Sequence, residues 1–381
     1  MQTNNNTETA VNSTDLFTPV QLGPYKLTHR VVMAPLTRMR TESDFVPNDL
    51  LVEHYSQRAT QGGYIVAEGT VISETGHGYY GAPGIYTDEQ VEGWKRVTAA
   101  VHNKGGIIFD QLFHVGRQSH RSLQPNGDQP IGASAIEFED FVYTPTGWLP
   151  TDLNRAMTTE EVKAMVEDYR KAAIRAKEAG FDGVELHGAN GYLVDQFLQD
   201  GSNQRTDIYG GSIENRVRFM LEIVEALVEV WGANRVAVRL GPSGTFASMF
   251  DSDPIALFGY AAEQLNKFGL AYLHLIEPRV KGSVEEVEDL EPVAAMHLRK
   301  IFKGTIIAAG GFDGEKANDI LQKGNADLVA FGRHFIANPD LVFRLKNNLP
   351  LNVYDRDTFY GGDARGYNDY PFYKEEEALS A

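Results

Sequence analysis

Short, continuously apolar runs recur along the chain, and most are followed by a segment with helical periodicity. Runs such as VVMAP, IIFDQL, VAVRL and TIIAAGG lack polar alternation, which predicts strands buried on both faces. We predict eight such strands, at residues 30–35, 64–70, 106–112, 183–188, 236–241, 271–277, 305–311 and 326–333. Because strands and helices alternate through eight units, the pattern predicts an α/β fold, a closed (β/α)8 TIM barrel rather than an open sheet.

The helical segments have recognisable start and stop signals. Thr158 and Glu161 have the spacing of a capping box, in which each side chain accepts a hydrogen bond from the other residue's backbone amide. Gly180 ends the helix that this capping box begins. The apolar face of the helix consists of Val162, Met165, Val166, Tyr169 and Ala173. Further helices are predicted at residues 212–231, 253–268, 291–303, 314–322 and 338–348.

Two insertions interrupt the alternation. Residues 16–28 contain two β-prone pieces around Gly23, which predicts an N-terminal hairpin that closes the lower end of the barrel. Residues 116–157 are rich in Pro, Gly and aromatic side chains and are too long for a plain connection after strand three. The loops that follow the strands of such a barrel build its active site, so we predict that this insertion forms a lid. The expected organisation is a flexible tail at 1–14, one barrel domain at 15–373 and an acidic tail at 374–381.

Composition narrows the possible partners. The chain has 35 Lys and Arg against 52 Asp and Glu, a formal charge of −17, so nucleic acid and anionic membrane surfaces are unlikely partners. An anionic cofactor therefore needs a local basic pocket. The absence of Cys excludes disulfides, thiolate metal sites and cysteine nucleophiles. The chain has neither a secretory signal pattern nor about 20 uninterrupted apolar residues, which predicts a soluble, cytoplasmic protein.

Polar residues at the C-terminal ends of barrel strands are the candidates for chemistry. His187 and Asn190 are three residues apart, so in a helical turn their imidazole and amide share a face and can converge on one oxygen. Such a pair would stabilise a developing negative charge. The alternative is that both side chains satisfy the backbone of their own loop.

The last two predicted strands end in glycines and an arginine. Gly310-Gly311 and Gly332-Arg333 suit a phosphate site of backbone amides and one cation, and tight turns with a surface ion pair are the alternative. Arg239 lies on an otherwise apolar strand and needs an anionic partner, either a ligand or a structural carboxylate.

The Gln111 amide suits the edge of a flavin or nucleobase, and bonding to barrel backbone is its alternative. No paired-ligand metal motif, GxxxxGKS loop or GxGxxG turn after the first strand is present, so we predict no metal and no Rossmann nucleotide site.

Five segments in a fixed order carry a resemblance that covers nearly the whole chain. They are LFTPVQLGPYKLTHRVVMAPLTRMR at 16–40, GYYGAPGIY at 78–86, HGANGYLVDQFL at 187–198, RTDIYGGSIENRVRF at 205–219 and FGRHFIANPDL at 331–341. Together they resemble the Old Yellow Enzyme family of flavin mononucleotide (FMN) oxidoreductases. The resemblance implies a TIM-barrel ene-reductase with tightly bound, non-covalent FMN in the 15–373 domain and NADPH or NADH as hydride donor.

The resemblance also implies roles for single residues. Thr37 lies near the flavin C4 carbonyl, Arg239 lies by N1 and O2, and the full set of cofactor contacts is Pro35, Thr37, Gly69, Gln111, Arg239, Gly310, Gly311, Gly332 and Arg333. His187 and Asn190 bind the substrate oxygen, and Tyr192 donates the proton. The remaining substrate contacts are Tyr79, Phe113 and Tyr360, for which ordinary aromatic packing is the alternative.

The reaction so implied is ping-pong reduction of the C=C bond of α,β-unsaturated carbonyls, maleimides or nitroalkenes. Some bacterial relatives carry His at the position of Asn190 and Trp at that of Phe113, so their substrate preference is not transferred here. Rival interpretations are an FMN barrel that oxidises hydroxy acids or dihydropyrimidines, a flavin-free aldolase or isomerase, and a barrel that binds ligands without catalysis. The expected partner is a small activated alkene or nitro compound, and the protein is a monomer or a homodimer.

Overall fold

The structure is a computed structural model that describes residues 14–278, 280–281, 284–285 and 294–374. Apart from Thr14 and Lys374, the two predicted tails lie outside the described residues.

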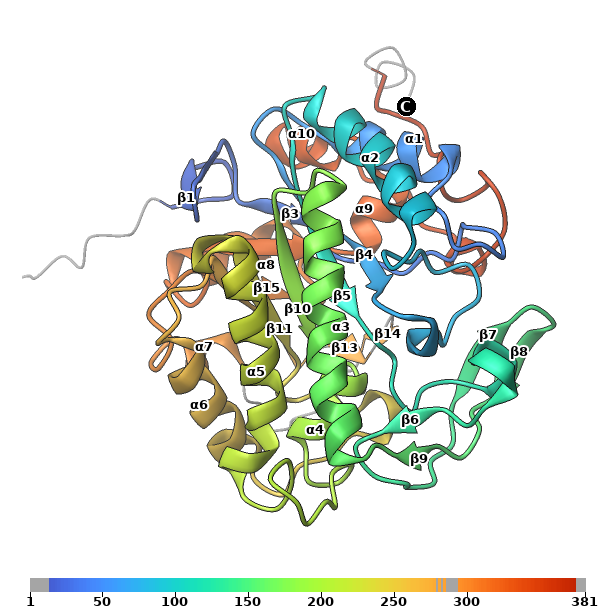
Figure 1. Cartoon of the computed structure of the whole chain (residues 1–381). Helices are drawn as coiled ribbons and strands as arrows, with labels where there is room; N and C mark the ends of the chain where they lie inside the picture. The colour runs from blue at the N-terminus through green and yellow to red at the C-terminus, as the bar shows by residue number, and fades with distance from the viewer. Residues whose placement is uncertain (1–13, 279, 282–283, 286–293, 375–381) are drawn as a thin grey trace, which may run out of the picture.

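Eight parallel strands close into a barrel, as the apolar runs predicted (Figure 1). Around the barrel each strand pairs with its neighbour in chain order, and β16 returns to pair with β3. The predicted runs coincide with these strands to within a few residues at each end. The strands are β3 (Val31–Met33), β4 (Tyr64–Val71), β5 (Ile107–Phe113), β10 (Gly183–Gly188), β11 (Val236–Leu240), β12 (Tyr272–Ile276), β15 (Ile306–Ala309) and β16 (Leu328–Phe331).

Helices cover the outside of the barrel, and α3, α5 and α6 stand side by side in Figure 1. The capping box at the start of α3 is confirmed: Glu161 N donates to Thr158 Oγ1 over 3.2 Å, and Thr158 N donates to Glu161 Oε2 over 2.8 Å. The α-helices are α1 (Asp49–Arg58), α2 (Asp88–His102), α3 (Thr159–Glu178), α4 (Leu193–Leu198), α5 (Ile213–Trp231), α6 (Pro254–Leu265), α7 (Ala295–Leu298), α8 (Gly314–Gln322), α9 (Arg333–Ala337) and α10 (Leu341–Lys346).

Two of the predicted helices are shorter than expected. The segment 291–303 contains only α7 in its described part, and residues 291–293 lie outside it. The segment 338–348 contains α10, which begins at Leu341 because Asn338 precedes Pro339 and is extended, with φ −129° and ψ 91°. The last strand was predicted to end at Arg333. This predicted end is wrong, because Arg333 begins helix α9 instead.

The predicted N-terminal hairpin is confirmed as β1 (Val20–Leu22) and β2 (Tyr25–Leu27), which pair antiparallel. Its turn requires glycine, because Gly23 has φ +51° and a Cβ there would lie 2.0 Å from the carbonyl oxygen of Asn234. Leu22 and Leu27 are buried against Phe109 inside the barrel. Asn234 lies two residues before β11, so the hairpin closes the end of the barrel where the strands begin.

The long insertion after β5 folds into short elements. An antiparallel hairpin of β7 and β8 projects from the body of the molecule (Figure 1). The insertion contains β6 (Ile131–Gly132), β7 (Phe141–Thr144), β8 (Gly147–Pro150), β9 (Arg155–Ala156), η2 (Arg121–Leu123) and η3 (Pro125–Gly127). The other short elements are β13 (Val280–Lys281), β14 (Val284–Glu285), η1 (Glu74–Gly76), η4 (Ala233–Arg235), η5 (Phe246–Ser248) and η6 (Arg356–Thr358). Within the described ranges, no helix has the length and apolar character needed to cross a membrane.

A single acidic side chain lies on β5 among apolar neighbours. Asp110 is fully buried, and neither of its carboxyl oxygens has a hydrogen-bond partner among the described residues. The nearby Thr70 hydroxyl, which works to lower the pKa of Asp110, donates instead to the carbonyl oxygen of Glu68 over 3.0 Å. Burial therefore dominates and raises the pKa of Asp110 to about 7.

We expect Asp110 to make the protein less stable as the pH rises. The folded protein holds the Asp110 proton up to about pH 7, whereas the unfolded chain loses it near the ordinary value of 3.8. The folded state thus binds more protons in this window, and the free energy of unfolding falls as the pH rises through it. Relative to the wild type, Asp110→Asn should gain up to about 4 kcal/mol between pH 4 and pH 8. Denaturant titrations at both pH values measure this difference, and a pH-independent difference would contradict it.

Candidate active site

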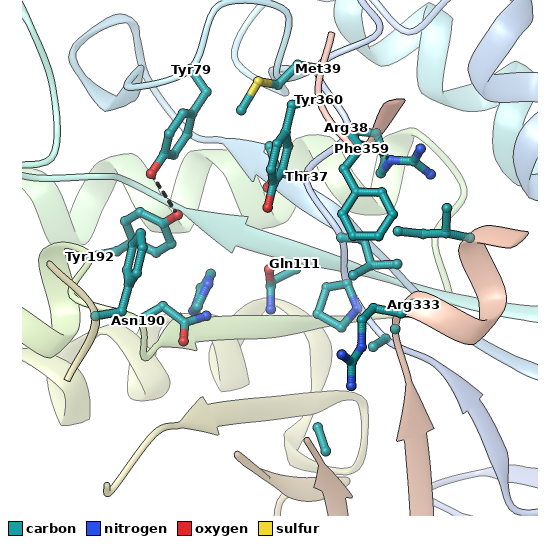
Figure 2. Close-up of a pocket in the computed structure, with 18 of the residues that line it drawn as sticks. Thr37, Arg38, Met39, Tyr79, Gln111, Asn190, Tyr192, Arg333, Phe359 and Tyr360 are labelled. Carbon is teal, nitrogen blue, oxygen red and sulfur yellow. Dashed lines mark hydrogen bonds between the residues drawn. The ribbon is translucent and has the colours of Figure 1, made fainter. Parts of the chain in front are cut away.

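One cavity of about 530 Å³ opens at the C-terminal ends of the barrel strands. It gathers most of the predicted site residues from segments that are far apart in the sequence. In Figure 2, Tyr79, Asn190 and Tyr192 lie on one side and Arg333 on the other, with Thr37 and Gln111 between them. The predicted residues that line it are Pro35, Thr37, Tyr79, Gln111, His187, Asn190, Tyr192, Arg239, Gly310, Gly311, Gly332, Arg333 and Tyr360.

Two predicted site residues are not among those that line the cavity. Phe113 is buried behind it, with its ring centroid 5.2 Å from that of Tyr192 and 6.0 Å from that of His187. Its ring therefore packs against two residues that line the cavity and is not itself part of the lining. Gly69 lies opposite Gln111 in the β4–β5 pairing, beside a register shift, and a Cβ there would lie 3.1 Å from the Phe113 ring.

The turn that holds His187 and Asn190 is not helical, so helical spacing is not what brings this pair together. His187 lies on β10, whereas Asn190 and Gly191 have φ of +58° and +73°. Asn tolerates this left-handed conformation better than most residues, and the Gly191 amide donates to Asp195 Oδ2 over 2.9 Å. The chain reverses through these two residues, and both His187 and Asn190 still line the same cavity.

His187 is electrically neutral in this environment. Burial, reinforced by the positive charge of Arg239, lowers the pKa of His187 to about 3. The imidazole therefore carries one N–H and one lone pair near neutral pH. A neutral ring can donate to a substrate oxygen without placing a second fixed cation beside Arg239.

Two tyrosines share a hydrogen bond at one side of the cavity. Tyr192 Oη donates to Tyr79 Oη over 3.2 Å (Figure 2), and the two rings meet edge to face. Burial raises the pKa of both phenols above their ordinary value, and the negative charge of Asp140 adds to this effect. Both hydroxyls therefore keep their protons until a stronger base is present.

A buried acid organises the floor of the cavity. Glu185 on β10 accepts hydrogen bonds from Gln111 Nε2 over 2.7 Å, Tyr272 Oη over 2.9 Å and His274 Nδ1 over 2.8 Å. The His274 proton is placed on Nδ1 because an ionised carboxylate can only accept. Burial works to raise the pKa of Glu185, but His274, Arg239 and these hydrogen bonds outweigh it and lower the pKa.

Glu185 was missed by sequence reasoning. It is the one acidic residue in the GVELHG strand, two positions before His187. The available signal was a charged residue inside an apolar strand, the same signal that identified Arg239.

The far side of the cavity is suited to an anion. Gly310 and Gly311 follow β15 with φ of +116° and +65°, conformations that favour glycine. Gly332 and Arg333 follow β16 at the start of α9. These backbone amides and one guanidinium supply donors and positive charge in a protein whose net charge is −17.

The donor set of the cavity fits FMN. Arg239 is buried, and its Nε has no hydrogen-bond partner among the described residues. An acceptor on the pyrimidine edge of a flavin would fill that position, and Gln111 would supply a second polar contact. Gly310, Gly311, Gly332 and Arg333 would hold the phosphate. Among the residues that the structure describes, no group of three or more His, Asp and Glu side chains could hold a metal ion.

Sequence reasoning also missed two buried arginines that hold the C-terminal segment over the cavity. Arg38 donates through Nε to the carbonyl oxygen of Phe359 over 2.8 Å and through Nη2 to that of Gly366 over 2.8 Å. Arg40 donates to the carbonyl oxygen of Thr358 over 2.8 Å. These bonds position Tyr360, which lines the cavity from this segment. The only sequence signal for this role was the pair of arginines in LTRMR. The carbonyl groups in the C-terminal segment to which they donate lie more than 300 positions away.

Comparison with known proteins agrees with this geometry. A sequence model of the NADH:flavin oxidoreductase / NADH oxidase family matches residues 15–352. The chain is 49% identical over 366 residues to 12-oxophytodienoate reductase 1 of Oryza sativa subsp. japonica, covering 94% of this chain and 93% of the relative. It is 46% identical over 372 residues to 12-oxophytodienoate reductase 2 of Arabidopsis thaliana, covering 95% and 96%.

Solved structures show the same likeness. Morphinone reductase matches with a TM-score of 0.90 at 48% identity, covering 97% of this chain and 99% of that chain. A structure of morphinone reductase in complex with tetrahydroNAD matches with a TM-score of 0.88 at 49% identity, covering 95% and 99%. Sequence and fold agree over nearly the whole chain, which therefore belongs to the NADH:flavin oxidoreductase / NADH oxidase family, the Old Yellow Enzyme family of FMN oxidoreductases.

Proposed function

We propose that this protein reduces the C=C bond of activated alkenes with electrons from NADH or NADPH, through bound FMN. One observation carries the proposal: His187, Asn190 and Tyr192 share one cavity with the Gln111 and Arg239 floor. The names of the relatives, 12-oxophytodienoate reductase and morphinone reductase, support an unsaturated carbonyl compound as substrate. The tetrahydroNAD complex of morphinone reductase supports a nicotinamide nucleotide as the reductant.

Bound FMN would supply the hydride chemistry that links the nicotinamide to the alkene. The chain's own part begins at the floor of the cavity. Arg239 would place a fixed positive charge beside the negative charge of the reduced cofactor, and Gln111 would hold the edge of its ring. Thr37, on the loop after β3, would contribute a hydroxyl contact to the cofactor.

His187 and Asn190 act on the substrate's carbonyl or nitro oxygen. A neutral imidazole N–H and an amide N–H donate to that oxygen, withdraw electron density and make the β-carbon electrophilic. Their stabilisation is largest when negative charge has built up on the oxygen, so it favours the transition state over the bound substrate.

Tyr192 supplies the proton at the α-carbon. Its raised pKa keeps the phenol protonated in the resting protein, and the developing carbanion is a strong enough base to take the proton. The Tyr79 hydroxyl, 3.2 Å away, is placed to donate to the phenolate that is left. A hydride delivered to the face opposite Tyr192 would give trans addition of hydrogen.

Purified protein should be yellow, and it should oxidise NADPH or NADH when 2-cyclohexenone or N-ethylmaleimide is present. Protein that takes up no FMN would overturn the cofactor assignment. Yellow protein that turns over neither acceptor would instead favour a binding-only barrel. Turnover of a hydroxy acid or a dihydropyrimidine in place of the alkenes would favour the rival FMN oxidoreductases.

We expect Tyr192→Phe to slow the alkene half-reaction by about 10²-fold, because a positioned acid contributes about 10² to 10⁴ in rate. Reduction of the flavin by the nicotinamide should change little, since it needs no proton from Tyr192. Stopped-flow absorbance separates the two half-reactions. Tyr169→Phe is the control, because it removes a phenol hydroxyl from a tyrosine that is buried on α3, outside the cavity. Equal slowing of both half-reactions would argue against the proton-donor role.

The substrate itself, the choice between NADPH and NADH, a cytoplasmic location and a monomeric or homodimeric state all stay predictions. The same is true of one FMN-binding domain at 15–373. The closed barrel supports that domain, since the strands that close it range from Val31 to Phe331.

A further inference from the structure

Three aromatic side chains and one carboxylate line the mouth of the cavity. We call this set the rim: Asp140, Phe141, Trp148 and Tyr360. The aromatic members are unusually exposed for such large side chains, at 57% for Phe141, 48% for Trp148 and 42% for Tyr360. They come from two segments about 200 positions apart, the β7–β8 hairpin and the C-terminal segment.

The rim is held in place although it is exposed. Trp148 and Tyr360 meet edge to face with centroids 6.1 Å apart, so the two segments touch at the mouth. Behind the hairpin, Val142 is fully buried, and the Tyr80 amide donates to the carbonyl oxygen of Tyr143 over 2.7 Å. The Arg38 bonds to the C-terminal segment hold Tyr360 from the other side. The aromatic faces are therefore arranged before any ligand arrives, which reduces the entropy cost of binding.

The charge at the mouth is negative. Asp140 forms no ion pair with another described residue, and its Oδ1 accepts a hydrogen bond from its neighbour's amide, Phe141 N, over 2.8 Å. Asp140 lines the same cavity as Tyr79 and Tyr192, and its charge adds to the rise that burial causes in the pKa of both phenols. Three cations line the same cavity and serve other positions: Arg38 donates to the backbone of the C-terminal segment, Arg239 lies at the floor and Arg333 lies on the far side.

From this arrangement we propose that the rim is a subsite for a positively charged substituent, so that the enzyme favours activated alkenes that carry an ammonium group. The proposal rests on the proposed alkene reduction and adds the class of substrate. Aromatic faces attract organic cations, and a neighbouring carboxylate strengthens that attraction. An anionic substituent would meet the carboxylate of Asp140 and the negative field of the whole protein.

A set of three maleimides tests the proposal with one reactive ring. N-ethylmaleimide is neutral, N-(2-trimethylammonioethyl)maleimide is cationic and N-(2-carboxyethyl)maleimide is anionic. Reduced holoenzyme is mixed with each, and the second-order rate constant of flavin oxidation is measured. We expect the cationic compound to react at least about fivefold faster than the neutral one, and the anionic compound at least about fivefold slower, since exposed cation–π contacts contribute about 0.5–1 kcal/mol each.

Substitutions test whether the preference for the cationic maleimide arises from the rim. Asp140→Asn should bring the cationic-to-anionic ratio down by at least about fivefold, and Trp148→Leu should slow the cationic compound more than the neutral one. Glu139→Gln is the matched control, because Glu139 is an exposed acid next in the chain that does not line the cavity. It removes the same charge from the protein and should leave the ratio unchanged.

Two outcomes would overturn the subsite. One is equal rates for the three maleimides in the wild type. The other is an equal effect of Glu139→Gln and Asp140→Asn, which would show that only the overall charge of the protein matters. Failure of the proposed function is distinct, because N-ethylmaleimide would then not oxidise the reduced enzyme at all. Calorimetric binding of phenol, 4-hydroxyphenyltrimethylammonium and 4-hydroxybenzoate gives the same ranking without turnover.

Discussion

The double change His187→Ala with Asn190→Ala should slow reduction of an alkene by on the order of 10³- to 10⁴-fold, because removing a single donor of this kind costs about 10² to 10³. Both side chains are proposed to donate a hydrogen bond to the same substrate oxygen. With neither present, the charge that develops on that oxygen meets only water or apolar surface. FMN should remain bound, since the donors assigned to the cofactor, Gln111 and Arg239, are untouched.

Two measurements check the double variant. Stopped-flow oxidation of the reduced flavin by 2-cyclohexenone gives the rate, and titration with a phenol followed in the flavin spectrum reports the oxygen-binding site directly. We expect slow oxidation and no phenol binding. Changing His102 and Asn103 to Ala, an exposed pair at the end of α2, controls for losing the same two residue types. An unchanged alkene rate in the cavity variant would refute the role of the pair.

Replacing Glu185 should have the second large effect. Glu185→Leu removes the carboxylate that Gln111, Tyr272 and His274 donate to, and it leaves Arg239 buried without its neighbouring negative charge. Removing one partner from a buried charge pair costs about 3–5 kcal/mol, and we expect that loss in the free energy of unfolding of the flavin-free protein. Denaturant titration measures it.

Glu185→Gln separates charge from shape. The amide is close in size to the carboxylate but carries no negative charge, so Arg239 becomes a less compensated cation. We expect the flavin reduction potential of the holoenzyme to rise, because the reduced cofactor carries more negative charge than the oxidised one. Equilibration with a redox dye measures the potential.

Glu68→Gln at pH 6 is the matched control for this potential. Glu68 is equally buried on β4, which is separated from β10 by β5 in the barrel, and burial raises the pKa of Glu68 to about 7, so it is already largely protonated at that pH. Its replacement should shift the potential little. A Glu185→Gln potential equal to that of the wild type would show that Glu185 does not act on the cofactor.

Patterns that act locally could be predicted from the sequence. Strands buried on both faces leave continuous apolar runs, and the capping box at Thr158 depends on residues three apart. That Gly311 and Arg333 line one cavity was predictable for the same reason, since each follows a recognisable strand. The barrel then brings those strand ends together, because adjacent parallel strands finish at the same edge.

Features that depend on several distant segments could not be predicted. Glu185 is one acid in an apolar strand, and its role is visible only once β5, β10, β11 and β12 lie side by side. The rim joins Trp148 to Tyr360, and no periodicity links two loops about 200 residues apart.

The hydrogen bonds from Arg38 and Arg40 to the C-terminal segment have a consequence for biosynthesis. Ribosomes synthesise the chain from its N-terminus, so the barrel cannot close until β16, about 300 residues after β3, has been made. The two arginines find their partners later still, when the carbonyl groups of residues 358–366 have been made. Such long-range pairing is slow and leaves apolar strands exposed meanwhile. We therefore expect flavin uptake only after β16 and residues 358–366 have been synthesised.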